Sequence, residues 1–301
     1  MTTQDPAFGA LHRRALHVHC YRMLGSYTDA DDLVQETMIR AWTARADYDP
    51  TTGDVGLRRW LYRIATNACL DFLKSAPRRV AAQSTSFNEV AWLQPYPDRL
   101  LDEESVAKET IALGYLALIQ LLPAQQRAVY LCRDVLGWSA AETADLLDVS
   151  VAAANSALQR ARETIAKHAG PVPPREPTDA ERAVLAAFID AHQRNDSAAA
   201  LALMREDIRV TMPPAPAVYV GREALRPLLV RAFESSMGEW KLLEAWANRQ
   251  PAAVSYLRAP DDTRFRAFKL DVLHVAGDRL AEITTFDVRY LDAFGLPEVL
   301  P

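Results

Sequence analysis

Apolar residues recur at steps of three and four along most of the first 170 residues, which is the spacing of helices with one buried face. In the stretch 57–74 the positions that follow this spacing are Leu57, Leu61, Ile64, Ala68 and Phe72. The same period predicts further helices over about 178–204 and 221–234. The chain is therefore predicted to begin with helical blocks and to keep some helices in its last third.

Beyond residue 238 the pattern changes to segments rich in β-formers. Four of them predict consecutive strands of an antiparallel sheet, namely EWKLLEAWANRQ, AAVSYLRA, RFRAFKLDVLHVAG and RLAEITTFDVRYL. Gly277 and Asp278 form a tight-turn signal between the last two. Because helices come first and strands follow, the last third is predicted to be an α+β domain.

Two segments interrupt these patterns. Residues 75–104 lack helical periodicity and contain three prolines, so they are predicted to be a long connector. The segment PVPPREP at 171–177 has four prolines in seven residues and is typical of a semi-rigid linker. The predicted domains are therefore 1–74, 105–170 and 178–301.

Composition narrows the class of protein without naming a function. The 301 residues include 34 Lys and Arg against 39 Asp and Glu, and the net charge of −5 argues against general coating of nucleic acid. No apolar run has the length of a membrane span, and the first residues lack a secretory pattern. Cys20, Cys69 and Cys132 form no CxxC pair, so we expect no disulfide framework, no metal site and a cytoplasmic location.

Carboxylates line one face of the helix predicted over 29–42, DADDLVQETMIRAW. Asp29, Asp32 and Glu36 share that face, with Gln35 beside them. From spacing alone, this acidic face is either a solvated surface or a docking surface for a partner.

The next helix has the opposite charge. Six basic residues and one acid lie between residues 58 and 79, with aromatic and amide side chains interleaved among them. Cations neutralise phosphates and aromatic rings stack on unpaired bases, so this mixture suits single-stranded or opening DNA. The candidate contacts are Arg58, Arg59, Trp60, Tyr62, Arg63 and Asn67. The alternative is that Trp60 and Tyr62 pack in the helical core.

Residues 122–165 have the pattern of a helix-turn-helix. A helix is predicted to about Val135, a break at Gly137, a short helix over 139–147 and a second helix from Val151 with Ser150 as its N-cap. The second helix of this motif enters the major groove of DNA. Its predicted outward residues are Ala152, Ala153, Asn155, Ser156, Gln159 and Arg160. A helical hairpin unrelated to DNA is the alternative.

These three motifs, in this order, resemble the extracytoplasmic-function sigma factors, the smallest class of bacterial RNA polymerase specificity subunit. The resemblance rests on DADDLVQETMIRAW, LRRWLYRIATNACLDFLKSAPRR and LPAQQRAVYLCRDVLGWSAAETADLLDVSVAAANSALQRAR. It implies two all-α domains, a region 2 helical bundle and a region 4 helix-turn-helix. It also implies that the acidic face binds core RNA polymerase, that the basic helix with loop 47–56 opens and reads the −10 element of promoter DNA, and that the helix-turn-helix reads the −35 element. The family usually has basic residues where this chain has Asn155 and Ala157.

The last block is similar to the SnoaL-like branch of the ketosteroid-isomerase-like fold, which some sigma factors carry at the C-terminus. The resemblance implies a curved sheet around a pocket, with a small ligand as a further partner. The connector stretch WLQPYPD holds apolar side chains that would be poorly placed in a solvated tether, so we expect Trp92 and Tyr96 to contact this domain or the sigma domains and to let it regulate the protein in cis. The alternative is that 178–301 is an independent module. Enzymatic members place a general base inside the pocket, for which the candidates here are His192, Asp271, His274 and Asp287.

Three functions are compatible with these patterns. The first is a sigma factor with a fused regulatory domain, which is the function we expect, with no catalytic residues and no cofactor. The second is a DNA-binding regulator that uses the helix-turn-helix without sigma activity. The third is an isomerase-like enzyme with an accessory N-terminal region. The acidic face beside a basic helix favours the first, because an ordinary repressor needs neither.

Overall fold

The computed structural model describes residues 10–75, 90, 92–101, 113–168, 177–233 and 237–301. The chain divides into two compact units. The first consists of residues 1–87 and 101–172, and the second of residues 88–100 and 173–301. Part of the predicted connector therefore belongs to the unit formed by the C-terminal domain. Of the predicted linker 171–177, only Pro177 lies within the described residues.

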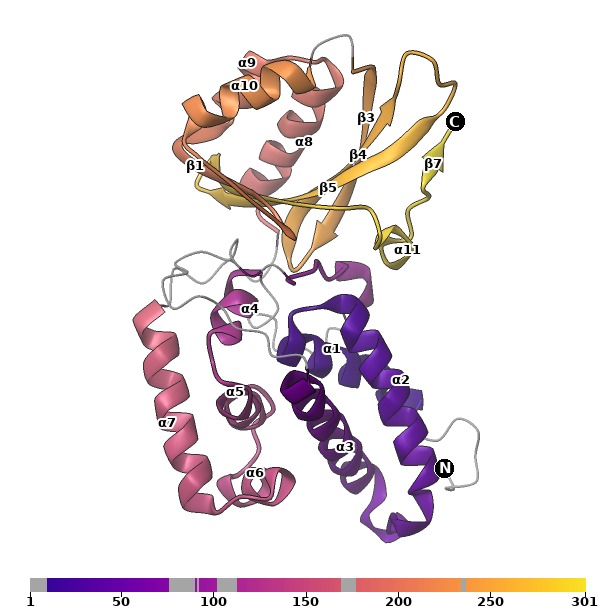
Figure 1. Cartoon of the computed structure of the whole chain (residues 1–301), viewed down its shortest axis with the longest axis vertical. Coiled ribbons are helices and arrows are strands. Elements are labelled where there is room, and N and C mark those ends of the chain that lie inside the picture. Colours follow the sequence, from indigo (N-terminus) through magenta and orange to yellow (C-terminus); the bar gives the residue numbers. More distant parts are fainter. Residues whose placement is uncertain (1–9, 76–89, 91, 102–112, 169–176, 234–236) are drawn as a thin grey trace. The chain divides into compact units, whose positions relative to one another are not determined.

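The first unit begins with a bundle of helices (Figure 1). Its long helices are α1 (Arg13–Leu24), α2 (Tyr27–Thr43) and α3 (Gly53–Ser75), with short 3₁₀ turns at Ala10–His12, Arg45–Asp47 and Pro50–Thr52. Ser26 caps α2 by accepting a hydrogen bond from the Asp29 N–H. Between α1 and α3, His19 Nε2 lies 2.9 Å from Thr66 Oγ1, and burial lowers the pKa of His19 to about 3. This neutral, hydrogen-bonded ring fits an apolar core without an unpaired charge.

The same unit continues with the helix-turn-helix. Its elements are α4 (Leu113–Gln120), α5 (Ala124–Tyr130), a π-helical turn (Leu131–Val135), α6 (Ala140–Leu147) and α7 (Val151–His168). Ser139 and Glu142 form a capping box at the start of α6, and Asp148 ends that helix with a φ of 52°. Ser150 Oγ accepts the Ala153 N–H at the start of α7, as predicted. The predicted helix-turn-helix is confirmed.

The second unit is a curved sheet backed by helices (Figure 1). The strands are β1 (Met204–Met212), β2 (Ala215–Val220), β3 (Glu239–Ala247), β4 (Gln250–Arg258), β5 (Phe265–Ala276), β6 (Arg279–Phe286) and β7 (Val299–Leu300). Their order is β2-β1-β6-β5-β4-β3, with β7 on β5. The sheet is mixed, because β1 pairs with β6 in parallel while the other pairs are antiparallel. The four predicted strands are confirmed as β3 to β6, whereas β1 and β2 were not predicted.

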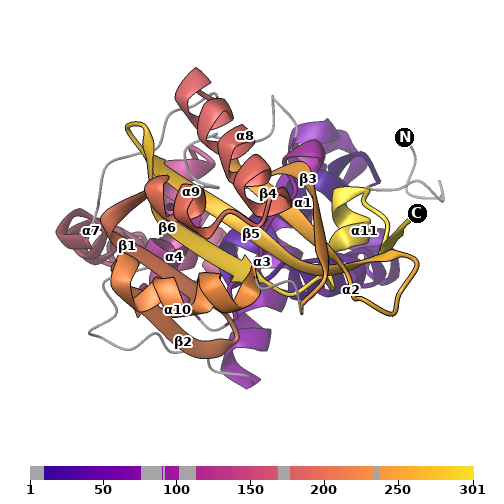
Figure 2. The same cartoon turned by 90° about the horizontal axis from the view of Figure 1, so that it is seen from above.

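Helices α8 (Asp179–Gln193), α9 (Ser197–Ala202) and α10 (Arg222–Ala232) cover one face of this sheet, and α11 (Leu291–Phe294) follows β6. Figure 2 shows α10 running beside β1 and β2, and α8 crossing the other half of the sheet. The core between them includes Leu185, Phe188, Ile208, Leu273 and Ile283. The predicted α+β class is therefore correct, and the parallel β1–β6 pair joins β1 and β2 to the antiparallel strands.

Candidate functional site

The acidic face lies on α2. Asp32 and Gln35 are exposed, whereas Asp29 and Glu36 are half-buried. Gln35 Nε2 donates to Asp31 Oδ2 at 3.1 Å, and Glu36 accepts from Arg40 Nε at 2.8 Å. The opposite side of the helix is buried at Val34 and Ala41. The face thus presents polar side chains to solvent on a helix that the core holds in place.

The basic helix is α3, and its side chains differ in accessibility. Arg58, Arg59, Arg63 and Asn67 are exposed, and Trp60 is half-buried with its ring centroid 5.4 Å from that of Tyr48 in the 47–56 loop. These four polar side chains are therefore exposed to solvent on α3, and Trp60 is partly exposed. Trp60 and Tyr48 thus form an aromatic pair at the start of α3.

Tyr62 has a different environment. Its side chain is 2% exposed, and its ring lies against those of His19 and Trp138, at centroid distances of 5.0 and 5.8 Å. Burial raises the pKa of its phenol. In this conformation Tyr62 is a core residue that no base can stack on, which favours packing in the helical core over a role at the DNA. The reason is that Tyr62 shares the buried side of α3 with Leu61 and Ala65.

The recognition helix α7 presents the predicted residues to solvent. The exposed side chains on its N-terminal half include Ala152, Ala153, Asn155, Ser156, Gln159 and Arg160. Leu158 and Ala161 face the core, and Arg162 fixes the helix to Asp134 through two hydrogen bonds of 2.6 and 2.8 Å. Of the two positions where the family usually has basic residues, Ala157 is buried. Asn155 remains the one departure that lies on the accessible face.

A buried polar junction joins α4 and α5 to the end of α1. The Arg127 side chain is 2% exposed and donates to the Met23 carbonyl, to Gln120 Oε1 at 2.6 Å and to the Leu122 carbonyl at 3.0 Å. Gln120 Nε2 donates to the Arg22 carbonyl at 3.1 Å. The Met23 and Arg22 carbonyls belong to the last turn of α1, where carbonyls have no donor within the helix and carry partial negative charge. Sequence reasoning missed this junction, because Arg127 is one of many arginines along the helices.

Further along the first unit, α3 faces α6. Arg59 forms an ion pair with Glu142, and Arg63 Nη1 lies 3.3 Å from Asp145 Oδ2. Arg63 Nη2 also donates to the Asp145 carbonyl at 2.8 Å. Two arginines assigned to DNA from the sequence are therefore bound to carboxylates of the helix-turn-helix.

The connector residues 92–100, which we call the docked segment, pack on the C-terminal domain in the second unit. Pro97 forms an antiparallel bridge with Ala247 at the end of β3. The Asn248 N–H donates to the Tyr96 carbonyl at 2.9 Å, and the Tyr96 N–H donates to Asn248 Oδ1 at 2.7 Å. Tyr96 is 1% exposed, Leu93 is buried and Trp92 is half-buried. The apolar residues of this segment thus belong to a packed core.

Two charged side chains add to this contact. Asp98 Oδ1 accepts the Arg249 N–H at 2.8 Å, and burial raises the pKa of Asp98 from 3.8 to about 6. Arg99 donates to the carbonyls of Ala293 and Asp292, at 2.7 and 2.9 Å, at the end of α11.

The turn between β3 and β4, on which the docked segment packs, has two residues in the left-handed backbone region. Asn248 and Arg249 both have positive φ, 56° and 60°, which closes the β3–β4 hairpin. Gly295 follows α11 with a φ of 70°, and a Cβ there would lie 3.2 Å from Arg99 Cζ. The pair Asn248-Arg249 was assigned to a strand from the sequence. An Asn between two β-rich stretches was the signal for the turn.

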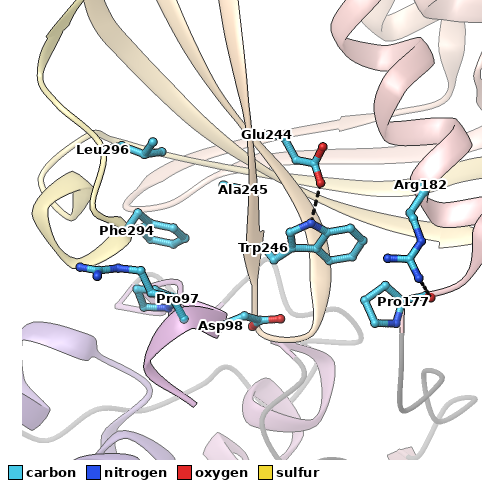
Figure 3. Close-up of a pocket in the computed structure, with 10 residues that line it drawn as sticks. Pro97, Asp98, Pro177, Arg182, Glu244, Ala245, Trp246, Phe294 and Leu296 are labelled. Atoms are coloured by element: carbon cyan, nitrogen blue, oxygen red, sulfur yellow. Dashed lines mark hydrogen bonds between the residues drawn. The ribbon is translucent and has the colours of Figure 1, made fainter. Parts of the chain in front are cut away.

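A cavity of about 330 Å³ lies beside the docked segment. Figure 3 shows Trp246 and Arg182 on one side of β3 and Phe294 and Leu296 on the other, with Pro97 and Asp98 below. Its lining is Pro97, Asp98, Arg99, Pro177, Arg182, Glu244, Ala245, Trp246, Phe294 and Leu296. The cavity therefore has walls from both the docked segment and the domain. The small ligand suggested by the fold stays a prediction.

Each of the four candidate general bases makes a contact within this domain or has a pKa shifted by burial. Asp271 is fully buried, accepts from Thr285 Oγ1 at 2.7 Å and lies 2.8 Å from Lys269 Nζ. Burial lowers the pKa of His192 to about 4, and its Nδ1 donates to the Phe188 carbonyl. Asp287 pairs with Arg289, and burial lowers the pKa of His274.

Within the part of the chain that the structure describes, no helix is both long and apolar enough to cross a membrane. In the same described ranges, no three His, Cys, Asp or Glu side chains gather in a way that could hold a metal ion.

Comparison with known proteins accounts for both units. Models of Sigma-70 region 2, Sigma-70 region 4 and the SnoaL-like domain match residues 10–79, 113–165 and 185–283. The ECF RNA polymerase sigma factor SigG of Mycobacterium tuberculosis is 37% identical over 311 residues, which cover 96% of this chain and 83% of that protein. The chain belongs to the ECF RNA polymerase sigma factors. SigM of the same organism is 32% identical over 159 residues, covering 53% of this chain and 74% of its own.

The fold of this sigma factor resembles that of a solved relative. The crystal structure of the Mycobacterium tuberculosis sigma factor SigJ has a TM-score of 0.64 and 22% identity, covering 95% of this chain and 96% of that one. The sigma factor thus has helical sigma regions followed by a SnoaL-like domain with a mixed sheet. It directs RNA polymerase to promoters, a role that belongs to a family of transcription factors, not of enzymes.

Proposed function

We propose that this sigma factor binds core RNA polymerase chiefly through the acidic face, and that the docked segment lets the SnoaL-like domain regulate promoter use in cis. The proposed domains are 1–74 for region 2, 105–170 for region 4 and 178–301 for the regulatory domain, joined by the connector 75–104 and the linker 171–177. In this scheme α3 and its preceding loop contact the −10 element, and the outward side of α7 contacts the −35 element.

The observation that carries cis-regulation is the pairing of the docked segment with the SnoaL-like domain. Three consecutive residues each make a different contact with the domain. Tyr96 donates to the Asn248 side-chain amide, Pro97 pairs with the end of β3, and Asp98 accepts from the Arg249 N–H. Arg99 then binds the end of α11. The segment lies between the two sigma regions in the sequence, so holding it on the C-terminal domain restricts how far those regions can separate. A tethered contact needs little affinity, because its effective concentration is high.

Transcription from purified core polymerase tests the regulatory part. In the full-length protein, Tyr96→Ala with Arg99→Ala removes a buried ring and the α11 anchor, and we expect run-off transcription from a promoter-fragment library to change about threefold or more. Arg264→Ala, an exposed arginine of the same domain, is the matched control and should transcribe as the wild type does. Equal transcription by the double variant and the control, across salt and temperature, contradicts cis-regulation.

Binding to core polymerase tests the acidic face. Asp32→Arg with Glu36→Arg reverses two charges on the surface of α2, where neither side chain is needed for the core. Charge complementarity governs association rate and orientation, so we expect core binding in a pull-down to fall at least about tenfold while the helical content stays unchanged. Asp190→Arg, on an exposed position of α8, serves as the control. Normal core capture by the double variant would show that the docking surface lies elsewhere.

A further inference from the structure

Helix α6 presents two carboxylates to two arginines of α3. Glu142 and Asp145 are three residues apart, and Arg59 and Arg63 are four apart, so each pair lies on one face of its helix. Arg59 pairs with Glu142, and Arg63 contacts both a carboxylate oxygen and the backbone carbonyl of Asp145. Two matched contacts between the same two helices make a surface, not an isolated ion pair.

Arg59 and Arg63 are also the arginines that we assign to the −10 element. An inference about what competes with DNA for them therefore rests on the proposed function of α3. A guanidinium binds a carboxylate and a phosphate through the same forked donors. Arg59 and Arg63 therefore cannot hold α6 and a DNA phosphate with the same donors at once. We propose that the acidic face of α6 (Glu142 and Asp145) is an intramolecular competitor of promoter DNA for α3.

The contact between Trp138 and Tyr62 also covers α3 on the side that faces α6. Trp138, which lies just before α6, is 5.8 Å from Tyr62 between ring centroids, and Tyr62 is 2% exposed. Movement of α6 away from α3 removes this cover as it frees the arginines. The phosphate-binding and aromatic side chains of α3 thus become accessible in one step.

The buried junction at Arg127 and Gln120 holds the helix-turn-helix on the first helical bundle, and so keeps α6 near α3. Arg127 and Gln120 hold α4 and α5 on the last carbonyls of α1, and both side chains are 2% exposed. By contrast, the Arg63 and Asp145 side chains are 45% and 77% exposed, and exposed ion pairs contribute little to stability. The junction is therefore the firm contact, and the α3–α6 surface is the part that a polyanion can displace.

The experiment uses the free full-length chain and a labelled pool of random single-stranded DNA of one length, with fluorescence anisotropy as the readout. Glu142→Gln with Asp145→Asn removes both carboxylates and keeps the capping box, which accepts Gln. We expect the variant to bind the pool about three- to tenfold more tightly at low salt, and the gain to shrink as salt screens the pairs. The matched control is Asp148→Asn with Glu163→Gln, which changes the net charge equally at exposed positions of the same motif.

Two outcomes separate this inference from the function on which it rests. If Arg59→Gln with Arg63→Gln leaves DNA affinity unchanged, the assignment of α3 to the −10 element fails. If that variant loses affinity, yet Glu142→Gln with Asp145→Asn binds no more tightly than the control, the assignment of α3 holds and competition by α6 is overturned.

Discussion

Asp98 shows how one residue sets the strength of a contact. Its carboxyl accepts the Arg249 N–H from a half-buried position, and burial raises its pKa to about 6. A carboxyl whose pKa rises on docking binds its proton more tightly in the docked state. Docking is therefore strongest below the ordinary pKa of 3.8, weakens as pH rises toward about 6 and is constant above that.

Replacing Asp98 by Asn should strengthen docking at neutral pH. The amide oxygen can still accept the Arg249 N–H, but no charge is desolvated. We expect slower hydrogen exchange at the Asn248 N–H, which donates to Tyr96, by severalfold at pH 7, with the difference disappearing near pH 4 after correction for intrinsic rates. Asp261→Asn, at an exposed site, should exchange as the wild type does. Faster exchange in Asp98→Asn would mean that the charge itself holds the segment.

At the scale of elements, α7 owes its exposed side to its neighbours. Leu158 and Ala161 are buried, Asp134 holds Arg162, and Ser150 caps the first turn. These contacts leave Asn155 and Gln159 one turn apart on the exposed side. Amide side chains pair bidentately with adenine, so this side of the helix suits recognition of base edges.

Asn155→Ala and Gln159→Ala should each relax promoter selectivity at one base position. Loss of a good base contact costs about 1–3 kcal/mol, and the rest of the site should be read as before. Selection of −35 sequences by polymerase carrying each variant measures this. Lys167→Ala, near the far end of α7, should leave sequence preference unchanged. Unaltered preference at every position in both amide variants would show that another part of α7 faces the bases.

At the scale of the whole molecule, the sigma regions share one compact unit, and part of the connector belongs to the other. Region 4 is held on region 2 by the Arg127 junction and by the α3–α6 surface. The docked segment is held by the hairpin turn at Asn248 and by α11. The docked segment lies between the two sigma regions in the sequence. The α3–α6 surface involves arginines of the helix that we assign to the −10 element. Under the proposed function, promoter recognition is coupled to these contacts inside the chain.

The sequence by itself determined the helix-turn-helix, the strands β3 to β6 and most of the longer helices. Their signals are local: apolar period, capping residues such as Ser139 and Ser150, and alternating β-formers. The exposed side of α7 followed from the same period. The helix predicted over 178–204 is instead two helices, α8 and α9, and Met204 already belongs to β1. Strands β1 and β2 escaped prediction because charged residues crowd the start of β1 and prolines lie between and within the two strands. Only the pairing of β1 with β6 joins them to the rest of the sheet.

Tertiary structure decided which side chains are available. Tyr62 and Trp60 are two residues apart in a basic helix, yet Trp138 and His19 bury one while the other stays half-exposed. The partners of Arg59 and Arg99, and the Met23 carbonyl that binds Arg127, come from far along the chain and leave no trace in local spacing. A local pattern reports the period of burial, whereas a long-range partner depends on how elements pack, and for that reason only the fold revealed them.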